Sequence, residues 1–67
     1  MTSDLDIYRT ANVLIREHGD EADLVAAMRA DSFLGDGDVD GSAIWKRVLA
    51  AIKEIQRGEP REGEAVN

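Results

Sequence analysis

Three aspartates at alternate positions are the strongest candidates for chemistry in this sequence. The run 36–41, DGDVDG, has carboxylates at its first, third and fifth positions and a glycine at its sixth, as at the start of a helix-flanked calcium loop. Calcium takes roughly six to eight oxygen ligands, and the loop normally obtains two from a Glu at its twelfth position, which here is Arg47. The motif therefore predicts at most a weak calcium site at Asp36, Asp38 and Asp40. The competing interpretation is a solvated turn whose aspartates cap the following helix.

The histidine and one further acid are the other candidate reactive groups. His18 has neither a nucleophile nor a second ligand beside it in the sequence, so we expect it to cap or pack at the end of a helix. Asp31 falls within an apolar helical arc, where an unpaired carboxylate would be costly. We expect it to form an ion pair with Arg47 or Arg9. These residues do not predict a catalytic site, and we expect no enzyme activity.

The composition excludes several classes of protein. The 67 residues include eight Lys and Arg and fourteen Asp and Glu, and the net charge of −6 disfavours binding to nucleic acid or to an anionic membrane surface. The absence of cysteine excludes a disulfide framework, a thiolate zinc site and a cysteine nucleophile. No apolar run approaches the roughly 20 residues that span a bilayer, and the first residues lack a signal-peptide layout. We expect a cytoplasmic protein.

Apolar residues repeat at helical spacing in three segments, which have recognisable start and stop residues. Ser3 and Asp20 are suitable N-caps for the first two segments, and Ser42 or Asp40 for the third. Gly19 ends the first segment, and we expect it to adopt a left-handed conformation. The predicted helices span about 4–18, 21–34 and 42–57.

These segments predict a small all-α fold. Because both connections are short, consecutive helices are expected to be antiparallel, which gives an up-down-up three-helix bundle. The expected domain covers 1–57, and 58–67 is expected to be a disordered tail. The second helix is expected to lie in the centre because it has two apolar seams. One seam contains Ala22, Ala26, Ala30 and Phe33, and the other contains Leu24, Ala27, Met28 and Leu34.

Two resemblances arise from these segments. The Gly-Asp turn at 37–41, followed by a helix with Trp45 and then small and aliphatic residues up to Ile52, resembles the second half of a tetratricopeptide-type helical hairpin. Such repeats need about three copies to share a core, so one unit implies similar geometry only. The patterns at 11–19, 26–31, 37–41 and 45–52 also resemble a group of short bacterial proteins with no assigned activity. That resemblance implies a compact helical fold and supplies no function.

Large apolar residues beside the main stripes are the candidate interaction surface. They are Trp45, Leu49, Val13 and Tyr8. Each can lie at the edge of the core or anchor a partner, and apolar surface left over on so small a protein favours self-association or a binding groove. The sequence therefore predicts a non-enzymatic protein–protein interaction module, homodimeric or bound to another protein, with Trp45 as anchor. The alternatives are a weak calcium-binding protein and an acidic inhibitor or nucleic-acid mimic that docks on a basic partner.

Overall fold

The described part of the chain is entirely helical apart from its ends and one turn. The computed structural model describes residues 3–58, so the predicted tail lies outside the described residues except for Gly58. Helices α1 (Asp4–His18), α2 (Ala22–Gly35) and α3 (Val39–Arg57) are present, and a short 3₁₀ helix, η1 (Gly19–Glu21), joins the first two. No strand occurs within 3–58. The predicted all-α class is confirmed.

Helix α1 begins and ends at the residues that the sequence indicates. The Oγ of Ser3 accepts a hydrogen bond from the N–H of Asp6 at 3.2 Å, which satisfies one of the free donors of the first turn. At the other end, Gly19 has φ 57° and donates its N–H to the carbonyl of Ile15. Its ψ of −125° lies outside the left-handed helical region that we expected, in backbone space that only glycine adopts readily.

The junction between α1 and α2 differs from the prediction. Asp20 does not cap α2; Glu21 holds the N-cap position, and no side chain caps the helix there. Instead, η1 continues the helical hydrogen bonding through the bend, and Gln56 Nε2 donates to the Gly19 carbonyl at 2.8 Å. Residues 4–35 therefore form one uninterrupted helical run with a sharp bend. The described residues therefore contain two uninterrupted helical stretches, 4–35 and 39–57, where we expected three separate helices.

Helix α3 begins three residues earlier than predicted. Its N-cap is Asp38, whose Oδ1 accepts a hydrogen bond from the N–H of Gly41 at 2.8 Å, and neither Ser42 nor Asp40 takes that role. Gly37, with φ 83°, allows the chain to reverse just before this cap. The first turn of α3 therefore uses residues that we expected to lie in the turn.

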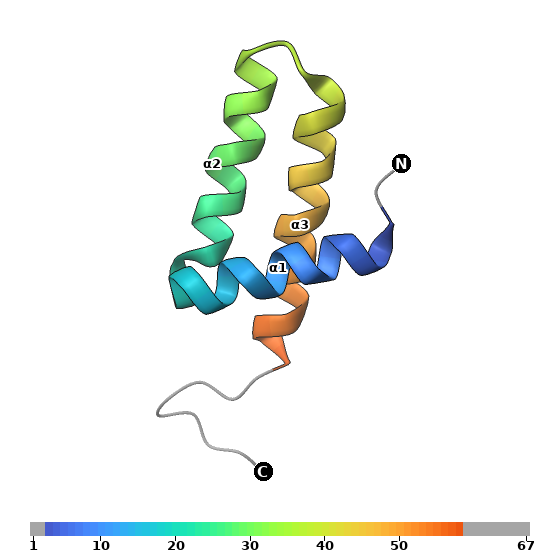
Figure 1. The fold of residues 1–67 in the computed structure, drawn as a ribbon. Helices are drawn as coiled ribbons and strands as arrows, with labels where there is room; N and C mark the ends of the chain where they lie inside the picture. The colour runs from blue at the N-terminus through green and yellow to red at the C-terminus, as the bar shows by residue number, and fades with distance from the viewer. Residues whose placement is uncertain (1–2, 59–67) are drawn as a thin grey trace.

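The helices do not form an up-down-up bundle. Helices α2 and α3 form an antiparallel hairpin, and α1 lies across this hairpin near the end where α2 begins (Figure 1). Helix α3, and not α2, makes extensive contacts with both other helices, so the expected central position of α2 is wrong. The sharp bend at η1 turns α1 across the hairpin, which prevents the three helices from aligning.

The core is small and rich in alanine. Five of its nine buried hydrophobic residues are alanines, which let the helix backbones approach closely. Ile52 and Val48 are the largest fully buried side chains. The first predicted seam of α2 is buried at Ala22, Ala26 and Ala30. The second is exposed at its large side chains, so it is not covered by another helix of 3–58, as a central position of α2 would require.

Candidate functional site

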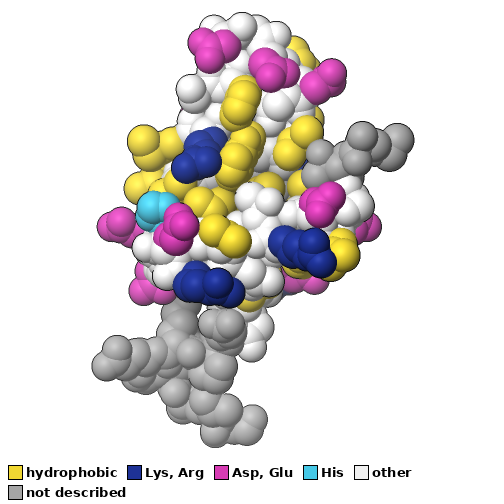
Figure 2. All heavy atoms as spheres, viewed as in Figure 1, with side chains coloured by type: hydrophobic (Ala, Val, Ile, Leu, Met, Phe, Trp, Pro, Cys, Tyr) yellow, Lys and Arg dark blue, Asp and Glu magenta, His cyan; other side chains and the backbone are white. Residues whose placement is uncertain are grey.

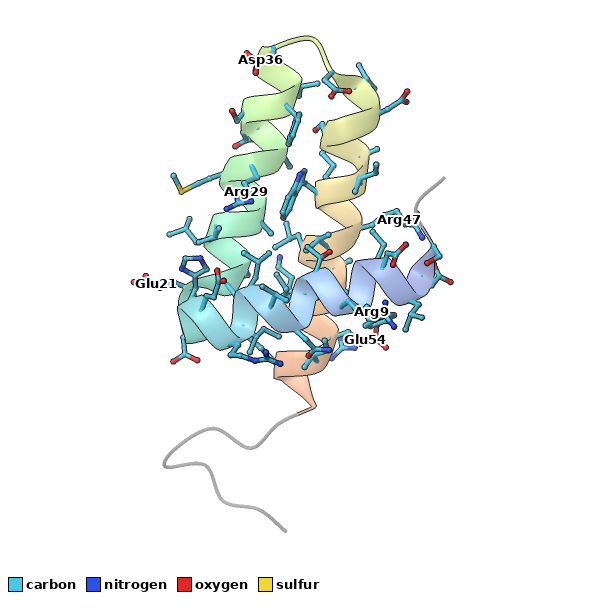
Figure 3. All side chains as sticks on the ribbon, in the orientation of Figure 1. Arg9, Glu21, Arg29, Asp36, Arg47 and Glu54 are labelled. Atoms are coloured by element: carbon cyan, nitrogen blue, oxygen red, sulfur yellow. The ribbon has the colours of Figure 1, made fainter. Side chains whose placement is uncertain are left out.

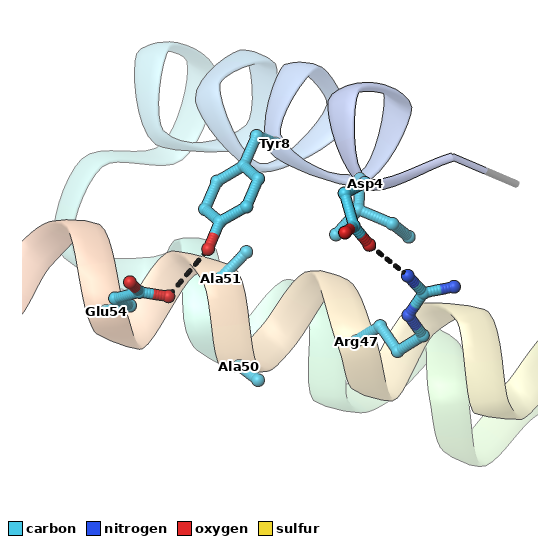
Figure 4. A pocket seen from close by; sticks show the side chains of 7 residues that line it. Asp4, Tyr8, Arg47, Ala50, Ala51 and Glu54 are labelled. Atoms are coloured by element: carbon cyan, nitrogen blue, oxygen red, sulfur yellow. Dashed lines mark hydrogen bonds and ion pairs between the residues drawn. The ribbon is translucent and has the colours of Figure 1, made fainter.

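A hollow between α1 and α3 is bordered by two polar contacts (Figure 4). It has a volume of about 260 Å³, and Ala50 and Ala51 form part of its lining. On one side, Arg47 Nη2 lies 2.6 Å from Asp4 Oδ1. On the other, the Tyr8 hydroxyl donates a hydrogen bond of 2.7 Å to Glu54 Oε2. Both contacts join residues more than forty positions apart, and no local sequence signal indicates them.

The chemistry of this hollow favours a structural role. The pKa of Tyr8 is raised, first because its phenol donates a hydrogen bond to Glu54 and second because that carboxylate's charge disfavours a phenolate. Tyr8 is therefore a poor nucleophile at neutral pH. The carboxylates of Asp4 and Glu54 are each engaged by a partner on the other helix. We interpret the two contacts as fixing α1 against α3.

The four predicted interaction residues lie on more than one face. Trp45 and Leu49 are one turn apart on α3, and both are half-buried against the core. The Arg29 guanidinium lies over the Trp45 ring, 4.9 Å from its centroid. Tyr8 is 38% exposed and Val13 46% exposed, and their five-residue separation places them about 140° apart around α1. The structure therefore brings Trp45 and Leu49 together and separates Val13 from Tyr8.

The three aspartates of the turn are used at helix ends. Asp38 caps α3, Asp40 lies in the first turn of that helix, and Asp36 follows the last residue of α2. Among residues 3–58, no group of three or more His, Cys, Asp or Glu side chains is arranged to hold a metal ion. The geometry accounts for Asp38 by capping, and a calcium site at this turn stays a hypothesis without a supporting contact.

Asp31 and His18 are both exposed. The expected ion pair of Asp31 does not form with either candidate: Arg47 contacts Asp4, and the Asp31 carboxylate has no hydrogen bond or ion pair with another residue of 3–58. The prediction was wrong because the arc that contains Asp31 is uncovered, so the carboxylate stays in water. His18 lies in the last turn of α1, with Nε2 3.9 Å from Glu17 Oε2.

The outward face of α2 presents a row of apolar side chains to solvent. We call this row, together with the acid within it, the outer stripe; it consists of Leu24, Ala27, Met28, Asp31 and Leu34. The spacing of three and four residues places its members along one side of the helix. Leu24, Met28 and Leu34 are 57%, 62% and 50% exposed, whereas Ala22, Ala26 and Ala30 on the other side are buried. Sequence periodicity identifies this stripe but does not show that it is uncovered.

Charge is distributed unevenly around the hairpin. Residues 20–40 contain seven acidic residues and one basic residue, a net charge of −6, which equals that of the whole chain. Residues 41–58 contain one acidic and four basic residues, a net charge of +3. Acidic side chains gather at the end of the hairpin where α2 meets α3 (Figure 2). The exposed apolar residues of α2 therefore lie in the most acidic part of the chain.

No known protein family, curated protein or solved structure matches this chain. Within 3–58, none of the helices has the length and apolar character needed to cross a membrane.

Proposed function

We propose that this protein is a small, non-enzymatic helical module that binds another protein through the outer stripe of α2. The observation that supports this is the exposure of Leu24, Met28 and Leu34 on a helix whose other side already forms the core. Full burial of a fully exposed side chain of this kind contributes roughly 1.5–3 kcal/mol, so burying the half that is still exposed here contributes about half as much. Several exposed apolar side chains in one row are typical of a binding surface.

The small core gives a second reason to expect a partner. A chain of this length buries only about 60% of the surface that it exposes when unfolded, so its stability is low. Alanines make up much of the core and contribute little apolar area each. A partner that binds only the folded chain raises its stability by mass action.

We place the main contact on α2 and not at Trp45. The Trp45 ring is half-buried, packs against the core and is covered on one face by Arg29, so much of its apolar surface is already used. Leu49 is likewise half-buried and can extend the contact from α3. Val13 lies apart on α1 and is not needed for it. A cytoplasmic setting is consistent with the cysteine-free composition.

The proposal is tested by comparing a double variant of the outer stripe with a control variant of an exposed apolar residue on another helix. In Leu24→Ser/Met28→Ser, the outer stripe loses its most exposed side chains, and in Val13→Ser an exposed apolar residue of α1 is lost. Circular dichroism first establishes that both variants keep the helical content of the wild type. Quantitative affinity capture from the native cell, together with sedimentation of the purified chain, then measures binding to other proteins and self-association.

We expect the double variant to lose a binding partner that the wild type and Val13→Ser retain. A homodimer of this chain would appear in sedimentation as a dimer that only the double variant dissociates. If all three chains are monomers and retain the same proteins, the outer stripe is not a binding surface and the proposal is wrong.

A further inference from the structure

We infer that the partner of the outer stripe is an amphipathic helix whose apolar side chains are flanked by Lys and Arg. This inference rests on the proposed function and adds the chemistry of the partner. Two features of the described residues support it. They are the geometry of the stripe and the sign of the charges around it.

The stripe has the dimensions of a helix-packing surface. From Leu24 to Leu34 it covers ten residue steps, or about 15 Å along the helix axis. Its side chains recur every three or four residues, which is the ridge pattern that packs against the ridges of a second helix. Ala27 lies between Leu24 and Met28 in the sequence and is half-buried. Its small side chain leaves room for a larger side chain of the partner. A docked helix of three turns would cover the whole stripe.

The charges around the stripe are acidic at both ends and in the middle. Asp20 and Glu21 precede α2, and Asp36 follows it; all three are exposed. Figure 3 shows Glu21 pointing away from the hairpin at one end of α2 and Asp36 at the other end. The one cation within 20–40, Arg29, contacts Trp45 of α3. A helix on the outer stripe would therefore meet carboxylates and no cation from this segment.

Asp31 is the residue of the stripe most suited to select a basic partner. It lies between Met28 and Leu34 along the stripe and is exposed, and its carboxylate has no ion pair with another residue of 3–58. A purely apolar partner would bury this carboxylate without compensation, which is costly. A Lys or Arg placed opposite Asp31 would satisfy the charge as the interface excludes water.

The same charges oppose self-association of one outer stripe with another. Two copies joined through this face would place two segments of net charge −6 against each other. Antiparallel packing of two α2 helices would also bring their Asp31 residues near one another. Such like-charge contacts select against a partner. A partner with the opposite charge pattern avoids this cost.

The experiment uses three fluorescently labelled helical peptides of equal length and fluorescence anisotropy with the full chain. The first has a leucine stripe flanked by Lys and Arg, and the second has the same leucine stripe flanked by Glu. The third keeps the Lys and Arg of the first but has Ser in place of Leu. We expect the first to bind at least about tenfold more tightly than either of the others, with affinity that falls as salt is added.

Variants of this chain locate the binding and test the role of charge. Asp31→Lys should weaken binding of the first peptide by about tenfold, whereas Glu17→Lys, the same charge change on exposed α1, should alter it less than about threefold. Leu24→Ser/Met28→Ser should also weaken binding.

Equal binding of the Lys/Arg-flanked and Glu-flanked leucine peptides would overturn the inference about charge and leave the proposed function intact. Equal binding of the two basic peptides would overturn the amphipathic requirement, because charge alone would then be recognised. If no peptide binds, the inference is wrong, and the capture and sedimentation experiment decides the proposed function separately. Self-assembly of the purified chain through the outer stripe would also overturn the inference.

Discussion

The guanidinium of Arg29 lies 4.9 Å from the centroid of the Trp45 ring and joins α2 to α3 across the hairpin. The contact covers one face of the indole and engages the one cation within 20–40. It therefore has two consequences. It adds to the stability of the hairpin, and it holds the one cation within 20–40 against Trp45 of α3.

Replacement of Arg29 should weaken the hairpin. A cation over an indole contributes about 0.5–1 kcal/mol at a partly exposed site, and the aliphatic part of the arginine adds packing. We expect Arg29→Ala to lower the free energy of unfolding by about 1 kcal/mol, measured in urea by the fluorescence of Trp45. Arg29→Lys keeps the charge but stacks less well on the indole, so it should lower the free energy of unfolding by less than Arg29→Ala does. An Arg29→Ala chain as stable as the wild type would show that the contact contributes nothing.

Gly41 should not tolerate a side chain. A Cβ at this position would lie 2.6 Å from Asp38 Oδ2 and 2.9 Å from Phe33 Cδ1, closer than packed atoms approach. We expect Gly41→Ala to lower stability by about 1–2 kcal/mol, although alanine is intrinsically the better helix former. The matched control is Gly35→Ala, because a Cβ there meets nothing within 4 Å and its φ is not positive. That variant should be as stable as the wild type or gain up to about 1 kcal/mol in thermal or urea unfolding.

The hydrogen bond between Tyr8 and Glu54 should be visible in an alkaline titration. Tyr8 is the only tyrosine, so absorbance near the phenolate band reports its ionisation alone. The pKa of Tyr8 is raised above 10.0 because its phenol donates to the Glu54 carboxylate. Glu54→Gln should shift the titration midpoint of Tyr8 in the folded chain down towards the ordinary tyrosine pKa, because the negative charge at position 54 is removed.

The sign of the pH effect on stability follows from this shift. The folded chain holds the phenol proton more tightly than the unfolded chain. The stabilisation of the folded chain by the Tyr8–Glu54 hydrogen bond is therefore fully present below the unfolded pKa of about 10. It is lost as the pH rises through the higher pKa of the folded chain. Urea unfolding across this range should show stability falling faster for the wild type than for Glu54→Gln. Parallel curves would mean that the contact does not form in solution.

Asp38 should matter for capping more than for charge. Asn also caps helices well, so Asp38→Asn should keep most of the stability, whereas Asp38→Ala should lose about 1 kcal/mol. Asp40→Ala is the control within the same turn and should lose only a few tenths of a kcal/mol through the helix dipole. Equal losses for Asn and Ala at position 38 would argue against the capping interpretation.

The calcium hypothesis makes a different prediction for the same turn. If Asp36, Asp38 and Asp40 bind calcium, millimolar ion should shift the amide signals of residues 37–41 in an NMR titration. Asp38→Asn, which keeps the cap, should then reduce these shifts. Unchanged amide signals in the wild type would leave capping as the role of Asp38.

Local signals in the sequence were enough to locate most of the helices. Apolar spacing, the Ser3 cap and the stop at Gly19 are local signals, and they located α1 correctly. The start of α3 was missed because Asp38, Asp40 and Ser42 are all good caps, and the choice depended on the turn at Gly37 and on contact between the cap and Gly41. The row Leu24, Ala27, Met28 and Leu34 was also evident from periodicity alone.

Which apolar rows are covered and which charges meet depends on how the helices pack against one another. Periodicity shows that α2 has two apolar sides, but only the path of α1 across the hairpin determines that one of them remains exposed. For the same reason Arg47 contacts Asp4, and Asp31 stays in water. These outcomes depend on the bend at η1 and on contacts between residues distant in sequence, whereas helical propensity and capping act over a few neighbouring residues. The outer stripe is thus a feature of the sequence whose availability for binding is set by the fold.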